Sequence, residues 1–432
     1  GVEPVRQLAA VTVFQVPPRL AALGYRTLVA ASLARRYGWR RCTSPVVERV
    51  ARVLSPVVIF RRKFYMHITF LLPNDNLTGG TRVVATYARL LQARGHQVLV
   101  VCNAPPRPGV REILRLLRRR NWEILRQRYF PRPGHIALSG VLMRRLEKNR
   151  PIVASDLPDA DVVVATWWET AVWMHDLPAA KGAHVHLVQG YEIWGGPEQR
   201  ERVHAALRLP NRKVSGSKVL KQEIEEVLGD LDMAVVTPAV DLDLFDAPRR
   251  SRQSPPTVGF IFAQTSIKGS DRCLRAIALA RRQVPDLRVL AFGAQQPNIE
   301  WPLPPGTDFT YRPAQSLIPS LYARCDMWLF ASRIDSFGLP ILEAMACRTP
   351  VIGVPIGAAP DLLAQGRGVL LSGTTDEEAL CQEMADAIVR LCRMPAEQWQ
   401  AMSDAAYAQS RRYSWQDATA LFEGLLQQAI EA

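Results

Sequence analysis

The segment from Ser332 to Ala346 holds the residues of this chain that are best placed to do chemistry. It contains Asp335, the turn Phe337-Gly338-Leu339 and Glu343, and it follows an apolar run that ends at Phe330. Proline is favoured at the first position of a helix, so Pro340 predicts a helix that begins there. The turn before it would present unpaired backbone N–H groups at the positive end of the helix dipole, and such a terminus suits a diphosphate.

Two carboxylates belong to the same turn. Glu343 falls in the first helical turn and Asp335 projects from the loop. A carboxylate beside a phosphate site makes sense if it binds sugar hydroxyls rather than the anion. The alternative is structural: Asp335 is a turn residue, and Glu343 is an acid that the helix dipole favours. The residue types alone leave both interpretations open.

As a whole, the segment resembles the donor-binding signature of the retaining GT-B glycosyltransferases of family 4. In that signature an acid is followed by seven residues and a Glu, through a Phe-Gly-Leu-Pro turn, as in Asp335 to Glu343 here. The resemblance covers roughly residues 66–430, and the stretch Gln189-Gly190-Tyr191-Glu192 is closest to rhamnosyltransferase-like members. It implies an α/β fold of two facing Rossmann-like, doubly wound domains with a cleft between them. Other matching motifs are Gly79-Gly80, Gly95-His96-Gln97-Val98, Lys268-Gly269, Pro350-Val351-Ile352 and Tyr413-Ser414-Trp415.

The resemblance also implies roles for individual residues. Glu343 would bind the ribose of the donor nucleotide, and Lys268 would neutralise the diphosphate leaving group. Asp335 takes the place of the acid near the transferred sugar and is the nearest candidate for a nucleophile. The remaining donor-binding candidates would act mainly through their backbone, and they are Ser336, Phe337, Gly338, Leu339, Gly79 and Gly80. The acceptor-side candidates are Gln189, Glu192 and Trp168.

Three departures from the family pattern bear on these roles. Asp335 is one methylene shorter than the usual Glu, and Ala263 stands where the family commonly has an Arg. Gln264 or an Arg elsewhere in the chain would have to compensate for that missing cation. Gln189 stands where a His is frequent, and a Gln cannot act as a base.

Alternating strand and helix patterns indicate how these residues are positioned. Residues 66–72, 80–94 and 97–102 read as strand, helix and strand, which is a right-handed βαβ unit. A second strand-helix series begins at residue 257, after a polar, proline-rich stretch over 246–256. We therefore expect an acceptor domain over 64–248 and a donor domain over 249–410. A C-terminal helix over 411–432 would pack back towards the first domain.

Charge is distributed unevenly along the 432 residues, whose formal net charge is +14. Residues 1–63, a basic leader, carry +10, residues 105–150 carry another +10, and the rest of the chain sums to −6. The second segment pairs Arg115, Arg118, Arg119, Arg120, Arg126 and Arg128 with Leu114, Leu117 and Trp122, which favours an amphipathic surface helix. We expect both segments to contact an anionic membrane surface rather than nucleic acid, with a plain solvated face as the alternative for the second. No run of 18 apolar residues predicts a spanning helix, and seven dispersed cysteines without a CxxC pair predict free thiols in a reducing compartment.

Together these features predict a metal-independent glycosyltransferase, without a cofactor, that is cytoplasmic and peripheral on the inner face of the plasma membrane. It would move a sugar from a nucleotide-diphosphate sugar to a glycan or lipid-linked acceptor in bacterial surface polysaccharide synthesis. Asp241-Leu242-Asp243 mimics a metal-binding Asp-x-Asp motif, but its place near the domain boundary argues against that role. The alternatives are a GT-B epimerase or phosphorylase, and a non-catalytic subunit that binds sugar nucleotides. Trp167 and Trp168 follow a predicted strand and would either line an acceptor sugar or pack in the core.

Overall fold

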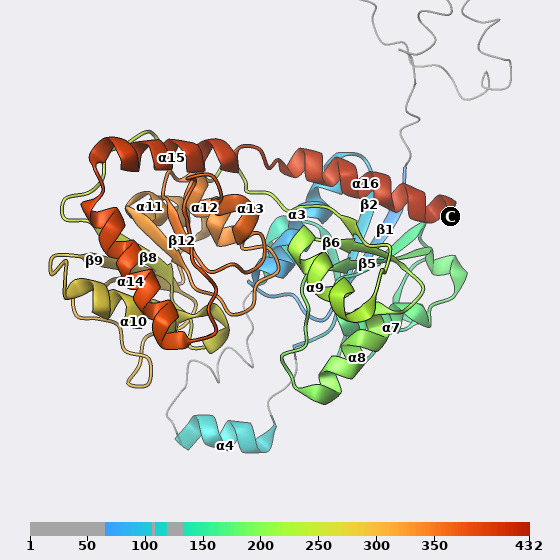
Figure 1. Ribbon diagram of the computed structural model, residues 1–432. Helices are drawn as coiled ribbons and strands as arrows, with labels where there is room; N and C mark the ends of the chain where they lie inside the picture. The colour runs from blue at the N-terminus through green and yellow to red at the C-terminus, as the bar shows by residue number, and fades with distance from the viewer. Residues whose placement is uncertain (1–64, 106–108, 119–132) are drawn as a thin grey trace, which may run out of the picture. The chain divides into compact units, whose positions relative to one another are not determined.

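The computed structural model describes residues 65–105, 109–118 and 133–432, and these form two parallel β-sheets with helices packed against them (Figure 1). The leader over 1–63 and most of the basic cluster, including Arg119, Trp122 and Arg126, lie outside the described residues. Residues 65–432 make up one compact unit. The predicted fold class, two Rossmann-like α/β domains, is confirmed.

The first sheet has seven parallel strands in the order β3-β2-β1-β4-β5-β6-β7. Its central strands are largely apolar, as expected where helices cover both faces of a parallel sheet. In β4, for example, all four residues are buried. The strands are β1 (His67–Leu72), β2 (Gln97–Cys102), β3 (Leu142–Arg145), β4 (Val162–Ala165), β5 (Ala183–Val188), β6 (Arg212–Ser215) and β7 (Ala234–Val235).

The second sheet has six parallel strands in the order β10-β9-β8-β11-β12-β13. The stretch over 246–256 connects the two sheets. Within it, Arg250 binds Asp326, and Arg252 donates to the carbonyls of Leu391 and Met394. The strands are β8 (Thr257–Ile261), β9 (Arg288–Gly293), β10 (Asp308–Tyr311), β11 (Met327–Phe330), β12 (Val351–Gly353) and β13 (Val369–Leu370).

Helices connect the strands in each half, as a parallel sheet requires. The helices of the first half are α3 (Gly79–Ala93), α4 (Val110–Arg118), α6 (His135–Ser139), α7 (Trp168–His175), α8 (Pro197–Leu207) and α9 (Lys218–Leu228). The second half has α10 (Ser270–Arg281), α11 (Ile318–Ala323), α12 (Leu339–Ala346), α13 (Ala359–Leu363), α14 (Glu377–Arg393), α15 (Ala396–Ser410) and α16 (Trp415–Glu431). Short 3₁₀ turns are η3 (Ala154–Asp156), η4 (Ala179–Lys181), η5 (Ser266–Lys268) and η6 (Gln315–Leu317).

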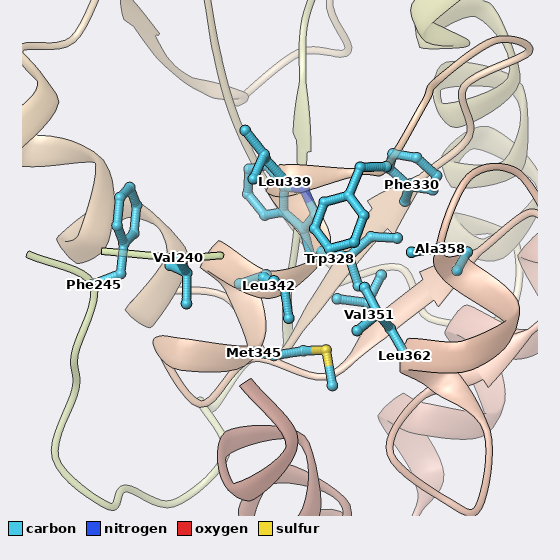
Figure 2. Packing of buried hydrophobic residues seen from close by; sticks show 14 of the residues in the cluster. Val240, Phe245, Trp328, Phe330, Leu339, Leu342, Met345, Val351, Ala358 and Leu362 are labelled. Atoms are coloured by element: carbon cyan, nitrogen blue, oxygen red, sulfur yellow. The ribbon is translucent and has the colours of Figure 1, made fainter. Parts of the chain in front are cut away.

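Helix α12 is buried on nearly every side, which fixes the residues that it carries. Figure 2 shows Leu339, Leu342 and Met345 of this helix packed among side chains from β11, from β12 and from the segment after β7. Trp328 of β11 is fully buried beneath the helix. A side chain that projects from α12 therefore has little freedom to move, because interiors are close-packed.

The last helix, α16, packs on elements of the first half, against α3, β4 and β5. Its Phe422 lies 4.8 Å from the ring of Tyr87 and 6.4 Å from that of Phe70, measured between ring centroids. Glu423 of α16 accepts hydrogen bonds from Arg94 and His96, both at 2.7 Å. The chain thus passes from the second half back to the first before it ends.

Candidate functional site

The candidate residues lie at the point in each sheet where the strand order reverses. In the first sheet that point is between β1 and β4, and in the second it is between β8 and β11. Ligands of open α/β sheets bind outside the carboxyl ends of the strands at this point. Gly79 and Gly80 follow β1, Trp168 follows β4, Lys268 follows β8 and Asp335 follows β11.

Glu343 is the most constrained of the carboxylates. It projects from α12, it is 5% exposed, and both of its oxygens have partners. Oε2 accepts a hydrogen bond of 2.9 Å from the hydroxyl of Tyr322, and Oε1 is bound by the guanidinium of Arg82. Burial and the nearby Glu343 charge raise the pKa of Tyr322 well above its usual value, so Tyr322 stays a hydrogen-bond donor. A buried carboxylate held in this way is positioned to accept hydrogen bonds from a ligand.

Asp335 is held by the loop and by Lys268 at the same time. Its Oδ1 accepts the backbone N–H of Gly338 at 2.8 Å and that of Phe337 at 3.3 Å, while Oδ2 accepts Lys268 Nζ at 2.8 Å. Asp335 therefore acts as a turn residue, one of the two interpretations left open by the sequence. The backbone N–H groups of Phe337 and Gly338, which we expected to meet the donor, are bound to Asp335 in this structure.

Two glycines allow the loops of the second half to approach each other. Gly269, directly after Lys268, has φ +69°, and a Cβ there would lie 1.9 Å from the carbonyl oxygen of Ala331. Gly338 has φ +89°, a left-handed conformation that glycine adopts without strain. The first glycine brings Lys268 to the end of β11, and the second lets the chain turn into α12.

Gly79 and Gly80 bring the start of α3 against both halves of the candidate site. A Cβ on Gly79 would lie 3.9 Å from Cδ1 of Leu339, and one on Gly80 would lie 3.4 Å from Oε1 of Gln189. Ser217 adds a second link, because its hydroxyl donates to the carbonyl of Ser336 at 2.9 Å. The start of α3 and the start of α12, both positive dipole ends, therefore lie next to each other.

On the first-half side, Glu192 is a buried carboxyl without a cation. It is 4% exposed, its Oε2 accepts the backbone N–H of Trp168 at 3.3 Å, and it makes no ion pair with any residue that the structure describes. Burial raises the pKa of Glu192 to about 8, and the charge of Glu169 adds to the rise. At neutral pH this carboxyl is mostly protonated, so it can donate a hydrogen bond as well as accept one. Gln189 lies close by and donates to the carbonyl of Thr166 at 3.4 Å.

The tryptophans after β4 divide between core and surface. Trp168 is 6% exposed and packs with Val188 and Val203, so its burial supports the core-packing interpretation of this residue. Trp167 is partly exposed and its ring centroid lies 5.7 Å from that of Trp194, which is 45% exposed. This aromatic pair is the surface of the first half best suited to a sugar ring. Trp194 carries no motif in the sequence that would have singled it out.

Neither Gln264 nor Arg333 is free to replace the cation missing at Ala263. The side chain of Gln264 donates to the carbonyl of Gln296, and its own N–H binds Gln295. Arg333 makes a two-pronged ion pair with Asp271 at 2.9 and 2.7 Å and also binds Glu377 at 2.8 Å. Both side chains are occupied in holding the second half together.

From the sequence we predicted no role for Arg82, Tyr322 or His135, which all lie near Glu343, although Tyr322 belongs to the stretch over 321–326 that resembles the family. Burial lowers the pKa of His135, and the charge of Arg82 lowers it further, while Asp75 and Glu343 oppose the shift. His135 is therefore neutral at physiological pH. The only signal for Arg82 was its position three residues after Gly79, one helical turn into α3.

The described part of the chain holds no cluster of three or more His, Cys, Asp or Glu residues arranged for a metal ion. Asp241 of the Asp-x-Asp stretch accepts the backbone N–H of Asp243 at 3.2 Å, which is a turn contact. No helix within residues 65–105, 109–118 and 133–432 is long and apolar enough to span a membrane. The six cysteines that are described, at positions 102, 273, 325, 347, 381 and 392, are free thiols.

Two regions of the chain match protein-family models. Residues 77–244 match the model described as Glycosyltransferase Family 4, and residues 255–393 match the one described as Glycosyl transferases group 1. The first match covers the first sheet from α3 onward, and the second covers the second sheet with the candidate residues Lys268, Asp335 and Glu343.

Known proteins are similar to this chain in part of its sequence or in fold. The D-inositol 3-phosphate glycosyltransferase of Segniliparus rotundus is 32% identical over 212 residues, covering 44% of this chain and 45% of that protein, so the match spans about half the length of the relative. The structure of HepE from Anabaena in complex with UDP and glucose has a TM-score of 0.63 at 17% identity, covering 84% of this chain and 100% of that one. WaaG, a glycosyltransferase involved in lipopolysaccharide biosynthesis, has a TM-score of 0.56 at 12% identity, covering 82% of this chain and 97% of its own.

Proposed function

We propose that this chain, which has the two domains of a GT-B glycosyltransferase, transfers a sugar from a nucleotide-diphosphate sugar to a glycan or lipid-linked acceptor with retention of configuration. The observation that carries the proposal is the meeting of Glu343, Lys268 and Asp335 with two helix N-termini at one place. HepE, which shares the fold, was solved with UDP and with UDP-glucose, which supports a nucleotide sugar as the donor.

Departure of the nucleoside diphosphate is the step that the second half would assist. The leaving group develops negative charge, and Lys268 together with the start of α3 would stabilise it. We propose that these protein groups supply that stabilisation without a metal or a cofactor. Glu343 would hold the ribose, and Asp335 would lie near the sugar once Lys268 turns towards the diphosphate.

The first half would bind the acceptor. The exposed pair Trp167 and Trp194 offers an apolar face for a sugar ring, and Glu192 with Gln189 offers hydrogen bonds to hydroxyls. Because both Glu192 and Gln189 are neutral at pH 7, an uncharged glycan fits this side better than an anion does. WaaG, similar in fold, takes part in lipopolysaccharide biosynthesis, which supports a role in bacterial surface polysaccharide synthesis, with rhamnosyl transfer as the specific expectation.

The enzyme would work beside an anionic membrane surface on the cytoplasmic side. Helix α4 supports this, since Val110, Leu114 and Leu117 are exposed on it together with Arg115 and Arg118. An exposed apolar row flanked by arginines is typical of helices that lie in a lipid headgroup layer.

A thermal-shift panel of nucleotide sugars tests the donor proposal. A ligand that binds the native state raises the melting temperature, by an amount that grows with ligand concentration over Kd. Among UDP-, GDP-, dTDP- and ADP-sugars, we expect those with one particular base to raise the melting temperature. The free nucleoside diphosphate with the same base should also raise it. A panel without any rise at millimolar ligand would contradict the proposal.

Product analysis separates transfer from the activities of other GT-B proteins. Incubation with the stabilising nucleotide sugar and candidate acceptors should release nucleoside diphosphate and form a glycoside whose anomeric configuration, read by NMR, matches the donor. An epimerised nucleotide sugar without acceptor would identify an epimerase, and phosphate-dependent cleavage of a glycan would identify a phosphorylase. Binding without any turnover would identify a non-catalytic subunit.

Sedimentation with vesicles tests the membrane proposal. At low salt, vesicles of phosphatidylglycerol and phosphatidylcholine should pull down the protein, and vesicles of phosphatidylcholine alone should not. The variant Leu114→Glu with Leu117→Glu should lose binding while Lys218→Glu, an exposed site on α9, should lose little. Equal recovery of the protein in the supernatant with both kinds of vesicle would show that the basic residues of α4 are merely solvated and do not bind lipid.

A further inference from the structure

We infer that Arg82 is a donor-binding residue: it neutralises Glu343 in the unliganded protein and moves to the diphosphate when the ribose takes its place on Glu343. The inference rests on the proposed function, because it takes Glu343 as the ribose-binding carboxylate. It also assigns the cation that is missing at Ala263 to the first half of the molecule.

The first observation is the pairing itself. The guanidinium of Arg82 binds Oε1 of Glu343 and the hydroxyl of Tyr322 binds Oε2, so a ribose at this carboxylate would compete with these two donors for its oxygens. Tyr322 is fixed in the core, whereas the side chain of Arg82 is 24% exposed. Of the two partners, Arg82 is the one that can leave.

The second observation is where a released Arg82 would find an anion. Arg82 lies one turn into α3, whose start at Gly79 is packed against Leu339 at the start of α12. The start of α3 has no side-chain cap and no acid in its first turn, whereas the N–H groups that precede α12 are bound by Asp335. A diphosphate at the open start of α3 would be within reach of Arg82, because arginine has a long side chain.

The third observation is that the other candidate cations are committed. Arg333 binds Asp271 and Glu377 in a forked arrangement, and Arg272 binds Glu377 and the carbonyl of Ala331. Lys268, which is paired with Asp335, would supply one positive charge to the diphosphate. Among these arginines of the described residues, Arg82 differs in its partner. It is paired with Glu343, the proposed ribose-binding carboxylate, so a bound ligand could release it.

When the donor binds, Glu343 and Arg82 would each exchange one hydrogen-bonding partner for another. Ribose hydroxyls would donate to Glu343 in place of the guanidinium, and the diphosphate would replace the carboxylate as the partner of Arg82. Arginine can bind phosphate with two parallel hydrogen bonds, whereas Arg82 contacts Glu343 through one guanidinium nitrogen and one carboxylate oxygen, so the exchange can add a hydrogen bond. A ligand that carries both ribose and diphosphate should therefore bind more tightly than a ligand that carries only one of them.

Isothermal titration of uridine and UDP, and of the adenosine and guanosine pairs, into wild type and Arg82→Ala tests this. The quantity compared is the ratio of the nucleoside Kd to the diphosphate Kd for the base that wild type binds. We expect Arg82→Ala to lower that ratio by about 10- to 100-fold, while the nucleoside itself binds at least as tightly as to wild type. Arg82→Lys should fall between, and Arg89→Ala, on the exposed face of the same helix, should match wild type.

Other outcomes overturn the inference. A ratio unchanged in Arg82→Ala, with both ligands weakened, would mean that Arg82 only supports the fold, and a ratio unchanged with both tightened would mean that it only blocks Glu343. Glu343→Gln gives the complementary check, since it should weaken the nucleoside but keep or raise the ratio. If wild type binds none of the nucleotides, the proposed function fails as well, whereas binding by wild type with an unchanged ratio defeats the Arg82 inference alone.

Discussion

The two halves of the candidate site hold their carboxyl groups in opposite ways. In the second half, Glu343 is paired with Arg82 and Asp335 with Lys268. In the first half, Glu192 is buried with one backbone hydrogen bond, and burial raises its pKa to about 8. Charged pairs suit a ligand that brings charge of its own, whereas a protonated carboxyl suits neutral hydroxyls. The contrast supports a charged donor on one side and an uncharged acceptor on the other.

The largest effects should follow from removing the charged groups of the second half. Glu343→Ala and Lys268→Ala should each lower transfer by about 100-fold or more, because each removes a charged contact to the donor or to its leaving group. The two variants should lose activity in different ways. Glu343→Ala should mainly raise the donor Kd, whereas Lys268→Ala should mainly lower kcat. Steady-state kinetics and titration of the nucleoside diphosphate measure both.

Controls for these variants come from exposed residues of the same types. Glu397→Ala on α15 and Lys218→Ala on α9 should retain wild-type transfer, since both side chains face solvent. Circular dichroism should show each variant folded, and Glu343→Gln serves if the alanine variant does not fold. Unchanged turnover in folded Glu343→Ala or Lys268→Ala would remove the donor site from the second half.

A smaller effect should follow from Asp335→Asn, which keeps the oxygen that accepts the N–H groups of Phe337 and Gly338 but loses the charge that faces Lys268. We expect kcat to fall by about 10- to 100-fold with little change in donor Kd, because the charge would act on the reacting sugar. Pre-steady-state or single-turnover rates at saturating donor measure it. A loss confined to donor affinity would contradict the placement of Asp335 near the sugar.

The first half should be tested by pH rather than by charge removal. Because the folded pKa of Glu192 lies above the ordinary value of 4.5, folding retains a proton that the unfolded chain releases, and stability is lost as pH rises from about 4.5 to about 8. Glu192→Gln cannot ionise, so it should gain in unfolding free energy relative to wild type across that window, by at most about 1.4 kcal/mol per pH unit. Urea denaturation at pH 5, 6.5 and 8 measures the gain. The exposed Glu201→Gln is the matched control, and a Glu192→Gln difference that stays flat with pH would show that the carboxyl is ionised throughout.

The smallest effect should come from the aromatic surface. Trp194→Ala should raise the acceptor KM about 2- to 10-fold and leave the donor Kd unchanged, since one face of a sugar ring loses its apolar contact. Acceptor titration at saturating donor measures it. An effect on donor binding instead would place the ring of Trp194 on the other ligand.

The sequence predicted local features well and partners across the fold poorly. Strands such as β4 and the start of α12 were predictable because an apolar run and Pro340 are signals within a few residues. The short edge strand β10 carries no such signal, because its residues are exposed or half-buried rather than an apolar run. The role of Arg82 depends on a contact with a residue 261 positions away, and no pattern within α3 indicates such a contact.

The same limit applies to burial. Asp335 and Lys268 were both singled out from the sequence, but their pairing at 2.8 Å, which depends on Gly269 approaching Ala331, was not. Burial of the tryptophans was also not predictable from the sequence. Trp168 was chosen as an acceptor-side candidate because it follows a strand, but it packs in the core, whereas Trp194 is exposed. Which side of a short segment faces solvent is decided by packing between elements distant in sequence.

Release of nucleoside diphosphate from nucleotide sugars tests the central claim most directly. Wild type and Glu343→Gln would be incubated with UDP-, GDP-, dTDP- and ADP-linked sugars, and the free diphosphate would be quantified by anion-exchange chromatography. We expect wild type to release diphosphate from at least one of these donors, and to release more when a suitable acceptor is added. Release by Glu343→Gln should be at least about 100-fold lower. Release that is absent with every donor, or equal for both proteins, would contradict it.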